Sequence, residues 1–301
     1  MAYVFATGSA PELLWPGIKT IYGISYNNYP KKYPEFFNME TSDKAFEKEQ
    51  GMTGFPLAAV KEQGNEVFFS QMYQGYQREY IHLTYSIGAV ITREMVEDDQ
   101  YNVIKKIPKL LAESMRQTEE TVATSVLNNA FDTSYTGADG QPLISSSHPL
   151  VAGGTFSNRP TTYADLTQTS LEQAIIDIMG FVDDQSLKIN IEPETLIVPR
   201  QEYFNAMKIL GTAFKVDSAD NTINPFFSNV KLKMVTSTFL TDSDAWFVKT
   251  NAADGLKFFT RREAELDKDN DFNTDNLKIK TSKHFSCGWT DPRGLYGSSG
   301  A

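Results

Sequence analysis

Residues 108–131, PKLLAESMRQTEETVATSVLNNAF, predict one long helix. Apolar or small side chains recur along it at every third or fourth residue, the spacing that gathers them on one face of a helix. They are Leu111, Met115, Thr118, Val122, Val126 and Ala130. Polar residues lie off this face, namely Glu113, Arg116, Gln117, Glu119 and Glu120. At 1.5 Å per residue the helix spans about 36 Å, so it is longer than most globular helices and predicts a structural spine.

The sequence leaves two possible start points for this helix. Pro108 suits the first turn of a helix, because a first-turn residue needs no N–H donor. Alternatively, the helix starts near Asp99 and kinks at Pro108.

The segment directly upstream, residues 81–91, has the clearest alternation in the chain. Ile81, Leu83, Tyr85, Ile87, Ala89 and Ile91 alternate with mostly polar residues. This pattern predicts a strand with one buried face. It places His82 on the polar face, away from any core.

Residues 46–80 read as a projecting β-hairpin. Gly64 and Asn65 tolerate positive φ and predict its turn. Residues 57–60 and 67–69 are its expected arms.

Residues 1–45 lack a clear period but are rich in aromatic side chains, unlike a disordered tail. We expect this segment to lie extended and to bury its rings. It is either a strap on its own domain or an arm on a neighbouring subunit, and the arm is favoured.

The remaining chain predicts a mixed, then β-rich region. Residues 140–165 are expected to be loops with short strands, and residues 170–182 a helix with a capping pair at Thr169/Glu172 or Ser170/Gln173. A buried strand at 195–198 precedes a helix from Pro199 to Gly211. Further strands are expected at 230–235, 246–249 and 277–285. The overall order predicts an α+β fold.

Length and charge exclude several classes of protein. The chain has 301 residues, and its 28 Lys and Arg against 38 Asp and Glu give a net charge of −10. Such a chain is a poor candidate for binding nucleic acid through phosphate neutralisation. No stretch approaches the roughly 18 apolar residues of a membrane span. A single cysteine, Cys287, allows no intrachain disulfide, which fits a reducing cytoplasm.

Few residues suggest chemistry. Ser145, Ser146 and Ser147 precede His148, but neighbouring loop residues seldom form a Ser–His pair with an orienting acid, so a capped turn is favoured over a hydrolase site. Cys287, between apolar neighbours, is expected in the core. We assign no catalytic, cofactor-binding or metal-binding residues.

Asp267, Asp269 and Asp271 have the opening spacing of a calcium loop. Phe272 stands where such a loop needs Gly, and Lys278 where it needs Glu, so an EF-hand is excluded. A solvated acidic loop is expected there, with a loose surface cation site as the alternative.

Several strings together resemble the major head subunit of Mu-type tailed phages. They are EDDQY (97–101), VLNNAF (126–131), DGQPL (139–143) with SHP (147–149), LIVP (196–199) and WTDPRGLYG (289–297). The resemblance runs from about residue 20 to the end of the chain.

That family is assigned to the Hong Kong 97 phage capsid fold, which implies an N-terminal arm (1–45), an E-loop hairpin (46–80), a P-domain (81–165 and 250–285) with a spine helix at about 108–131, and an A-domain (166–249 and 286–301). The implied function is a major capsid protein that self-assembles through hexamers and pentamers into an icosahedral head around double-stranded DNA. Portal, scaffolding or protease, and decoration proteins are the implied partners. The implied location is the virion, with assembly in the host cytoplasm.

Three alternatives share some of these features. An encapsulin-like cargo shell has the same fold. A soluble hydrolase would use His148. A tail tube or sheath subunit would form helical rods and not closed shells.

Overall fold

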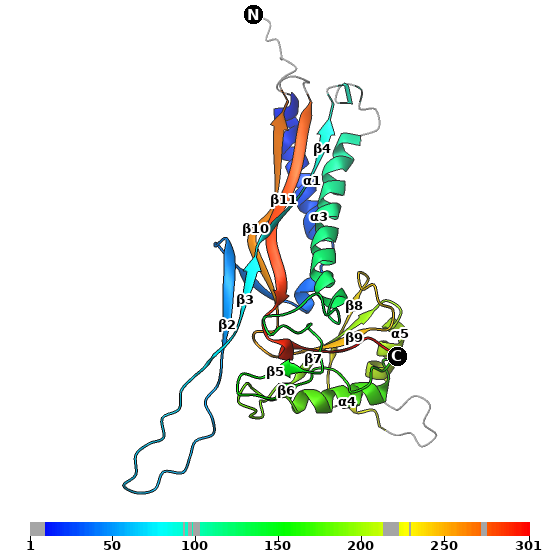
Figure 1. Cartoon of the computed structure of the whole chain (residues 1–301). Helices are drawn as coiled ribbons and strands as arrows, with labels where there is room; N and C mark the ends of the chain where they lie inside the picture. Colours follow the sequence, from blue (N-terminus) through cyan, green and yellow to red (C-terminus); the bar gives the residue numbers. More distant parts are fainter. Residues whose placement is uncertain are drawn as a thin grey trace, which may run out of the picture.

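The computed structural model describes residues 10–92, 94, 95, 98, 103–212, 223–228, 230–271 and 276–301. Figure 1 shows a tall column of long strands and two long helices standing on a lower part that holds a second sheet and shorter helices. A long loop projects from the side of the molecule, beyond strands β2 and β3. The mixed helix and sheet content confirms the predicted α+β class.

The column is built on a four-stranded sheet in the order β1-β10-β11-β4. β1 (Asn38–Thr41) runs parallel to β10 (Leu256–Asn270), whereas β11 (Leu277–Trp289) is antiparallel to both β10 and β4 (Leu83–Ile91). The highly charged residues 261–270 therefore all lie in strand β10. Its charged side chains are tolerated because they lie largely exposed on this sheet.

Helix α3 (Val103–Asn128) is the predicted spine and lies along the column beside β11 and β4. Most of its apolar stripe is buried as expected, with Leu111 and Met115 packed against Ile279 and Leu266 of the sheet, whereas Thr118 and Val122 are half-buried. The described helix begins before Pro108 and passes through it, while the proposed start near Asp99 lies outside the described residues. Pro108 removes one backbone N–H donor from the second turn of the described helix, and the helix continues through it.

The prediction of an extended N-terminal segment is wrong for the described part. Residues 10–28 form helix α1 (Ala10–Asn28), followed by the short 3-10 helix η2 (Tyr33–Glu35). α1 packs beside α3, and Tyr22 and Tyr26 are buried in the column. The tyrosines follow helical spacing, and Pro16 near the helix start hid this period. The described segment is thus a strap on its own domain.

The hairpin exists, but its paired strands differ from those predicted. β2 (Phe46–Met52) pairs with β3 (Gln74–Ile81), and residues 53–73 form an open loop. Gly64 has φ +90°, as the turn requires. The expected arms at 57–60 and 67–69 are not strands, and Pro56 beside the first of them has no N–H to donate to a ladder.

The alternating strand at 81–91 is interrupted at its second residue. His82 separates β3 from β4 and is buried, contrary to the prediction that it lies away from the core. Leu83 and Ile87, predicted to be buried, are exposed. β4 is an edge strand, so α3 covers only part of its inward face.

The lower part holds the second sheet, in the order β12-β9-β7-β8. Its strands are β7 (Pro193–Pro199), β8 (Lys233–Ser237), β9 (Trp246–Thr250) and β12 (Leu295–Ser298). Helices α4 (Gln168–Met179), α5 (Tyr203–Gly211) and α6 (Pro225–Ser228) lie beside it. A two-stranded ribbon, β5 (His148–Pro149) with β6 (Thr155–Phe156), and the 3-10 helix η3 (Pro292–Gly294) complete this part.

Several predicted boundaries move by a few residues. α4 is capped by Thr167 with Ser170, and not by the two pairs expected from the sequence, because the Thr167 side chain accepts the Ser170 N–H and Ser170 reciprocates. α5 begins at Tyr203, since Pro199 ends strand β7 and a turn follows. The strand expected at 230–235 is observed as β8, at residues 233–237. None of the helices in the described residues is long and apolar enough to cross a membrane.

Candidate functional site

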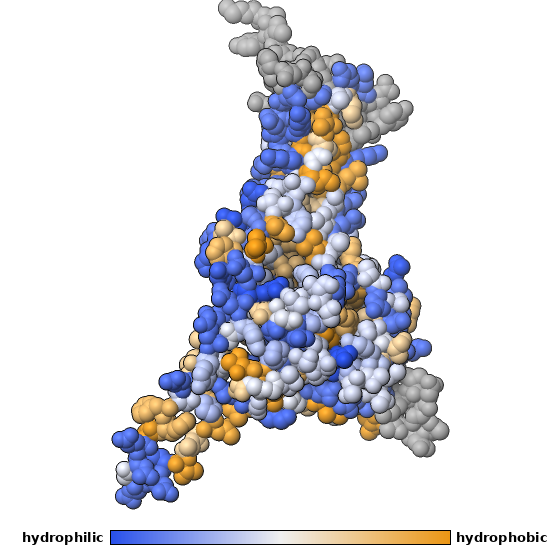
Figure 2. Space-filling view, viewed as in Figure 1, coloured by the Kyte–Doolittle hydropathy of each residue, from blue (hydrophilic) through white to orange (hydrophobic). Residues whose placement is uncertain are grey.

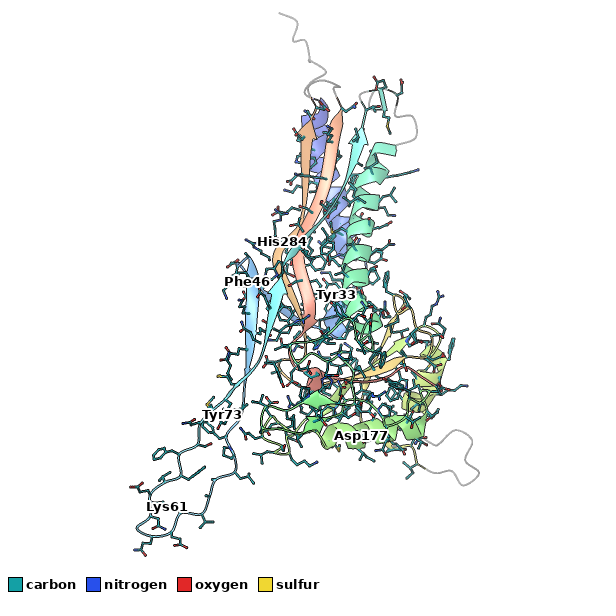
Figure 3. The ribbon with its side chains drawn as sticks, in the orientation of Figure 1. Tyr33, Phe46, Lys61, Tyr73, Asp177 and His284 are labelled. Carbon is teal, nitrogen blue, oxygen red and sulfur yellow. The ribbon has the colours of Figure 1, made fainter. Side chains whose placement is uncertain are left out.

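The hairpin loop, residues 53–73, carries a large exposed apolar surface. Its exposed apolar side chains are Phe55, Leu57, Val60, Val67, Phe68, Phe69, Met72 and Tyr73. Val60 is 95% exposed and Phe69 is 87% exposed. Figure 2 shows this apolar surface on the projecting loop, and Figure 3 places Lys61 at its far end and Tyr73 at its base. Contiguous exposed apolar surface of this kind marks a place where another molecule binds.

The backbone of the hairpin loop is also largely unpaired. The described backbone hydrogen bonds lie at its two ends, from Thr53 N to the Tyr73 carbonyl at the base and from Asn65 N to the Glu62 carbonyl at the tip. Between them, the extended arms keep free N–H and C=O groups that a neighbouring strand edge can bind.

The base of the hairpin, in contrast, is firmly attached to the column. Lys257 of β10 contacts Glu49 of β2 and also lies 3.3 Å from Glu40 and 3.0 Å from Asp254. Burial opposes the charge on Lys257, but the hydrogen bonds and charges of Glu49 and Asp254 prevail and raise its pKa. Thr290 donates a hydrogen bond to the same Glu49 carboxylate.

Two further side chains of β3 attach the hairpin to the end of β11. The Tyr80 hydroxyl lies 2.6 Å from that of Thr290. The Arg78 guanidinium lies 5.1 Å from the centre of the Trp289 ring and donates to the Thr136 carbonyl at 3.0 Å. A fixed base carrying a free apolar loop is the geometry of a contact element aimed at another chain.

A buried polar cluster on α3 joins the strap to the spine, and sequence reasoning missed it. Arg116, Glu119 and Glu120 were placed off the apolar face, yet all three are buried. Arg116 lies 3.3 Å from the centre of the Tyr26 ring, and it donates to the Tyr26 carbonyl and to Glu119. The available signal was the Arg-x-x-Glu spacing on a helix that follows a tyrosine-rich segment.

Glu119 is the centre of this cluster. It accepts hydrogen bonds from the Tyr26 and Tyr33 hydroxyls and lies 3.2 Å from Lys283 of β11. Burial alone raises its pKa, but Lys283, the Tyr26 hydroxyl and Arg116 outweigh burial and lower it. One carboxylate therefore joins the strap, the spine and the sheet.

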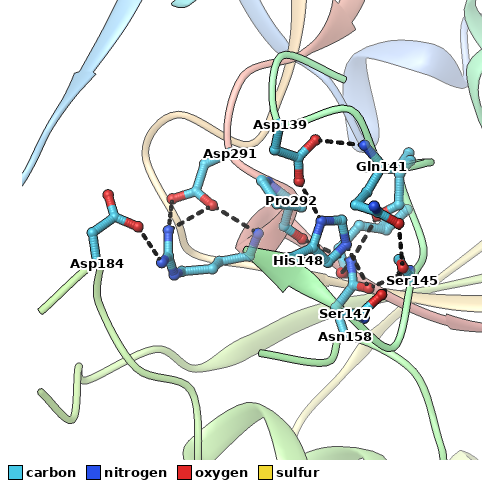
Figure 4. Close-up of polar contacts among 12 residues, drawn as sticks. Asp139, Gln141, Ser145, Ser147, His148, Asn158, Asp184, Asp291 and Pro292 are labelled. Atoms are coloured by element: carbon cyan, nitrogen blue, oxygen red, sulfur yellow. Dashed lines mark hydrogen bonds and ion pairs between the residues drawn. The ribbon is translucent and has the colours of Figure 1, made fainter. Parts of the chain in front are cut away.

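His148 lies in a second polar cluster, shown in Figure 4. Its Nδ1 lies 2.6 Å from Asp139 Oδ2, and its Nε2 lies 3.2 Å from Asn158 Oδ1. Both ring nitrogens are therefore engaged by groups other than a serine hydroxyl. Ser145 Oγ instead donates to Gln141. This arrangement is the capped turn that the sequence favoured, and it does not pair His148 with a nucleophile.

Arg293 extends this cluster into the C-terminal string. It donates to Asp184 at 2.8 Å, to both carboxylate oxygens of Asp291 at 3.2 Å and to the Val182 carbonyl at 2.7 Å. Asn158 donates to the carbonyls of Leu143 and Leu295. The strings at 139–149 and 289–297 thus meet in space, where they join the column to the lower part.

The remaining candidates lie apart from these surfaces. Asp267 and Asp269 are in strand β10, opposite Lys280 and Lys278 of β11, so the prediction of a solvated acidic loop is wrong at these two residues. Asp271 accepts a hydrogen bond from Lys278. Across the part of the chain that the structure describes, no group of three or more His, Cys, Asp or Glu residues is arranged to hold a metal ion.

Cys287 packs against the core at the junction of the column and the lower part. Burial raises its pKa to about 12, and its Sγ lies 3.5 Å from the Val122 carbonyl. A thiol so far from ionisation is a poor nucleophile, in agreement with the prediction of a core residue.

Comparison with known proteins gives one family. A family model described as phage capsid protein matches residues 76–298. No curated protein matches the sequence.

Solved structures of similar fold include viral shells. The procapsid of bacteriophage JBD30 is 12% identical, covers 97% of this chain and 76% of its own, and gives a TM-score of 0.56. The JBD30 capsid decorated with minor capsid protein trimers is 14% identical, with 71% and 92% covered and a TM-score of 0.55. A virus-like particle from Pyrococcus furiosus is 9% identical, with 94% and 98% covered and a TM-score of 0.53. At these identities the similarity establishes a shared fold.

Proposed function

Because the chain belongs to the phage capsid protein family and is a structural, shell-forming protein with the Hong Kong 97 phage capsid fold, we propose that its copies assemble through hexamers and pentamers into the icosahedral head shell of a tailed phage or prophage. The shell encloses double-stranded DNA without reading its sequence. The net charge of −10 supports this role, since a strongly basic lining would hold the phosphates and hinder packaging and release.

Each part of the molecule has its own role in the proposed assembly. Residues 46–80 serve as the E-loop and reach a neighbouring copy. The column corresponds to most of the P-domain, assigned to 81–165 and 250–285, and the lower part to most of the A-domain, assigned to 166–249 and 286–301. The β5–β6 ribbon of the lower part falls in the P-domain range, and the last residues of β11 fall in the A-domain range. Residues 10–37 act as an internal strap of the P-domain.

The observation that carries the proposal is the exposed apolar hairpin loop. In a free subunit its apolar side chains stay in water, and burying them on a neighbour gains roughly 25 cal/mol per Å² of apolar area. Each contact is modest, but a closed shell makes many of them at once. A donor loop on one copy and an acceptor surface on the next form a head-to-tail contact, which generates rings.

Other components of the particle are partners under this proposal. A portal, a scaffolding protein or protease and decoration proteins accompany such a shell in the host cytoplasm and in the virion. The encapsulin-like alternative is not favoured, because the matching family is one of phage capsid proteins. Co-purification of the shell with phage DNA, and not with a protein cargo, is the result expected.

Replacing residues 54–72 by an Asn-Gly turn tests the proposal. Thr53 and Tyr73 are already hydrogen-bonded, so a two-residue turn closes the shortened hairpin. We expect the variant to keep the wild-type Tm, because the hairpin base is attached independently, and to form no shells under electron microscopy. A variant of unchanged length, Leu57→Ser with Val60→Ser and Phe69→Ser, separates apolar contact from loop length. Shells of normal diameter from either variant contradict the proposed role of the loop.

A further inference from the structure

His82 occupies the one position where the hairpin becomes part of the column. It is the single residue between β3, which pairs with β2, and β4, which pairs with β11. The residues on either side, Ile81 and Leu83, are exposed, whereas the His82 ring is buried. The change of strand partner therefore happens around a buried imidazole.

Both ring nitrogens of His82 bind hydroxyl groups of other segments. Nδ1 lies 2.9 Å from Ser286 Oγ of β11, and Nε2 lies 3.2 Å from Ser42 Oγ, just beyond β1. The Ser42 hydroxyl donates to Glu47 at 2.7 Å, so its proton is already committed. Nε2 then carries the proton that it donates to Ser42, and Nδ1 accepts from Ser286. The neutral imidazole satisfies every group in this set.

The charged groups around His82 come from several elements. His284 of β11 stands at right angles to it, with ring centres 6.0 Å apart, and Arg261 of β10 is also near. Glu47 of β2 is the opposing negative charge, and it is paired with Lys44 at 2.9 Å. A proton added to His82 thus meets more positive than negative charge.

We propose that His82 is a proton-sensitive clamp that holds the upper end of the β2–β3 hairpin against the column, and that protonation of its ring releases this end. The attachment at Glu49, Arg78 and Tyr80 is separate from the clamp and stays in place. The hairpin therefore pivots about that lower attachment when the clamp opens. Because the hairpin carries the projecting loop, the clamp sets the direction in which the loop points.

The direction of the pH effect follows from linkage. Burial, then His284 and Arg261, lower the pKa of His82 below its ordinary 6.5, and Glu47 only partly opposes them. The released state keeps the ordinary pKa and binds the proton more readily, so the clamp is stable above pH 6.5 and weakens as pH falls below it. The equilibrium constant for release rises by at most about tenfold per pH unit until the pKa of the closed state is reached.

The titration of Glu47 does not overlap the pH range in which the clamp is expected to open. The hydrogen bonds from Lys44 and Ser42 lower its pKa, so its carboxylate remains ionised at pH 5. The control of loop direction in a shell rests on the proposed function, but the clamp itself is a property of one chain. Its test needs no assembly, so failure of the clamp and failure of the shell proposal are distinguishable.

The experiment uses the full-length protein and amide hydrogen exchange at the clamp, read at the Ser42 N–H, which donates to the Thr260 carbonyl at 3.1 Å, and at the Lys44 N–H, which donates to Ser42 Oγ at 3.1 Å. His82→Gln keeps a donor and an acceptor but does not titrate at these pH values. Wild type and His82→Gln are compared at the same pH, so that intrinsic exchange rates cancel. We expect equal exchange at pH 7.5 and severalfold faster exchange in the wild type at pH 5, with residues 196–198 of β7 unchanged in both. Equal exchange at pH 5 overturns the proposal.

A second pair of variants tests the clamp even if His82→Gln does not fold. The chain has three histidines, so the imidazole signal of His82 can be followed by NMR. His284→Gln removes a repelling group and moves both the His82 midpoint and the exchange transition to higher pH. Glu47→Gln removes the attracting charge and moves both to lower pH. Shifts in the same direction, or an exchange transition that does not follow the His82 signal, contradict the clamp.

Discussion

Two neighbouring glutamates on α3 have opposite electrostatic environments. Glu119 is surrounded by Arg116, Lys283 and two tyrosine hydroxyls, and its pKa is lowered despite burial. Glu120 accepts hydrogen bonds from the backbone N–H groups of Lys32 and Tyr33, and burial raises its pKa. Adjacent residues of the same type therefore make a matched pair for mutation.

Glu119→Gln is expected to destabilise the protein by about 3 kcal/mol at pH 7, because it leaves the buried Arg116 and Lys283 without their shared anion. Glu120→Gln keeps the acceptor and removes only a buried charge, so we expect little loss or a small gain. Denaturant unfolding at pH 7 measures both. Equal losses in the two variants contradict this assignment.

The same pair has a pH signature. The stabilisation from Glu119 is complete above its ordinary pKa of 4.5 and is lost as pH falls below that value. Wild type and Glu119→Gln should converge in stability below pH 4.5, whereas the raised pKa of Glu120 acts in the opposite direction.

The contact between Gly255 and Gly294 predicts a second residue-scale effect. A Cβ built on Gly294 lies 2.3 Å from the Gly255 Cα, a backbone atom that does not move aside easily. Gly294→Ala should therefore lower stability by about 1–3 kcal/mol. Gly211→Ala at the end of α5 is the control, because nothing lies within 4 Å of its added Cβ and stability should rise by up to about 1 kcal/mol. A thermal melt distinguishes the two variants.

At the scale of elements, the spine helix allows a sharp test. Val122→Pro removes a backbone donor in the middle of α3 and clashes with the preceding turn, at a cost of about 3 kcal/mol or more. Pro108→Ala restores a donor near the start of the same helix and should leave Tm unchanged or higher. An unchanged Tm in Val122→Pro contradicts the role of α3 as the structural spine.

Elements with a strong local period were predicted well from the sequence. The apolar stripe of α3 and the buried run of β7 follow directly from side-chain spacing. The helical form of the strap was missed, and its attachment to the spine could not be predicted because the contacts are distant in sequence: the Tyr26 hydroxyl reaches Glu119 on α3. The helical spacing also predicts that Arg116 is exposed. It is buried because the ring of Tyr26, from a distant segment, covers its guanidinium.

At the scale of the whole molecule, the order of strap, hairpin, spine and lower part was predictable, but their joints were not. The cluster around His148 and Arg293 unites segments whose sequence spacing gives no hint of contact. The hairpin loop was expected to project, and its apolar surface can be read from the sequence. Its separation from a firmly attached base depends on Lys257, which lies far along the chain.

The column sheet has a consequence for biogenesis. β4 is synthesised well before its sheet partner β11, and β1 well before its partner β10. Long-range pairing of this kind folds slowly. Until β10 and β11 have emerged, α1 and α3 lack most of the sheet that they cover, so the nascent chain is exposed to proteases and to association with other unfinished chains. Formation of the column in each copy therefore waits for the synthesis of β10 and β11.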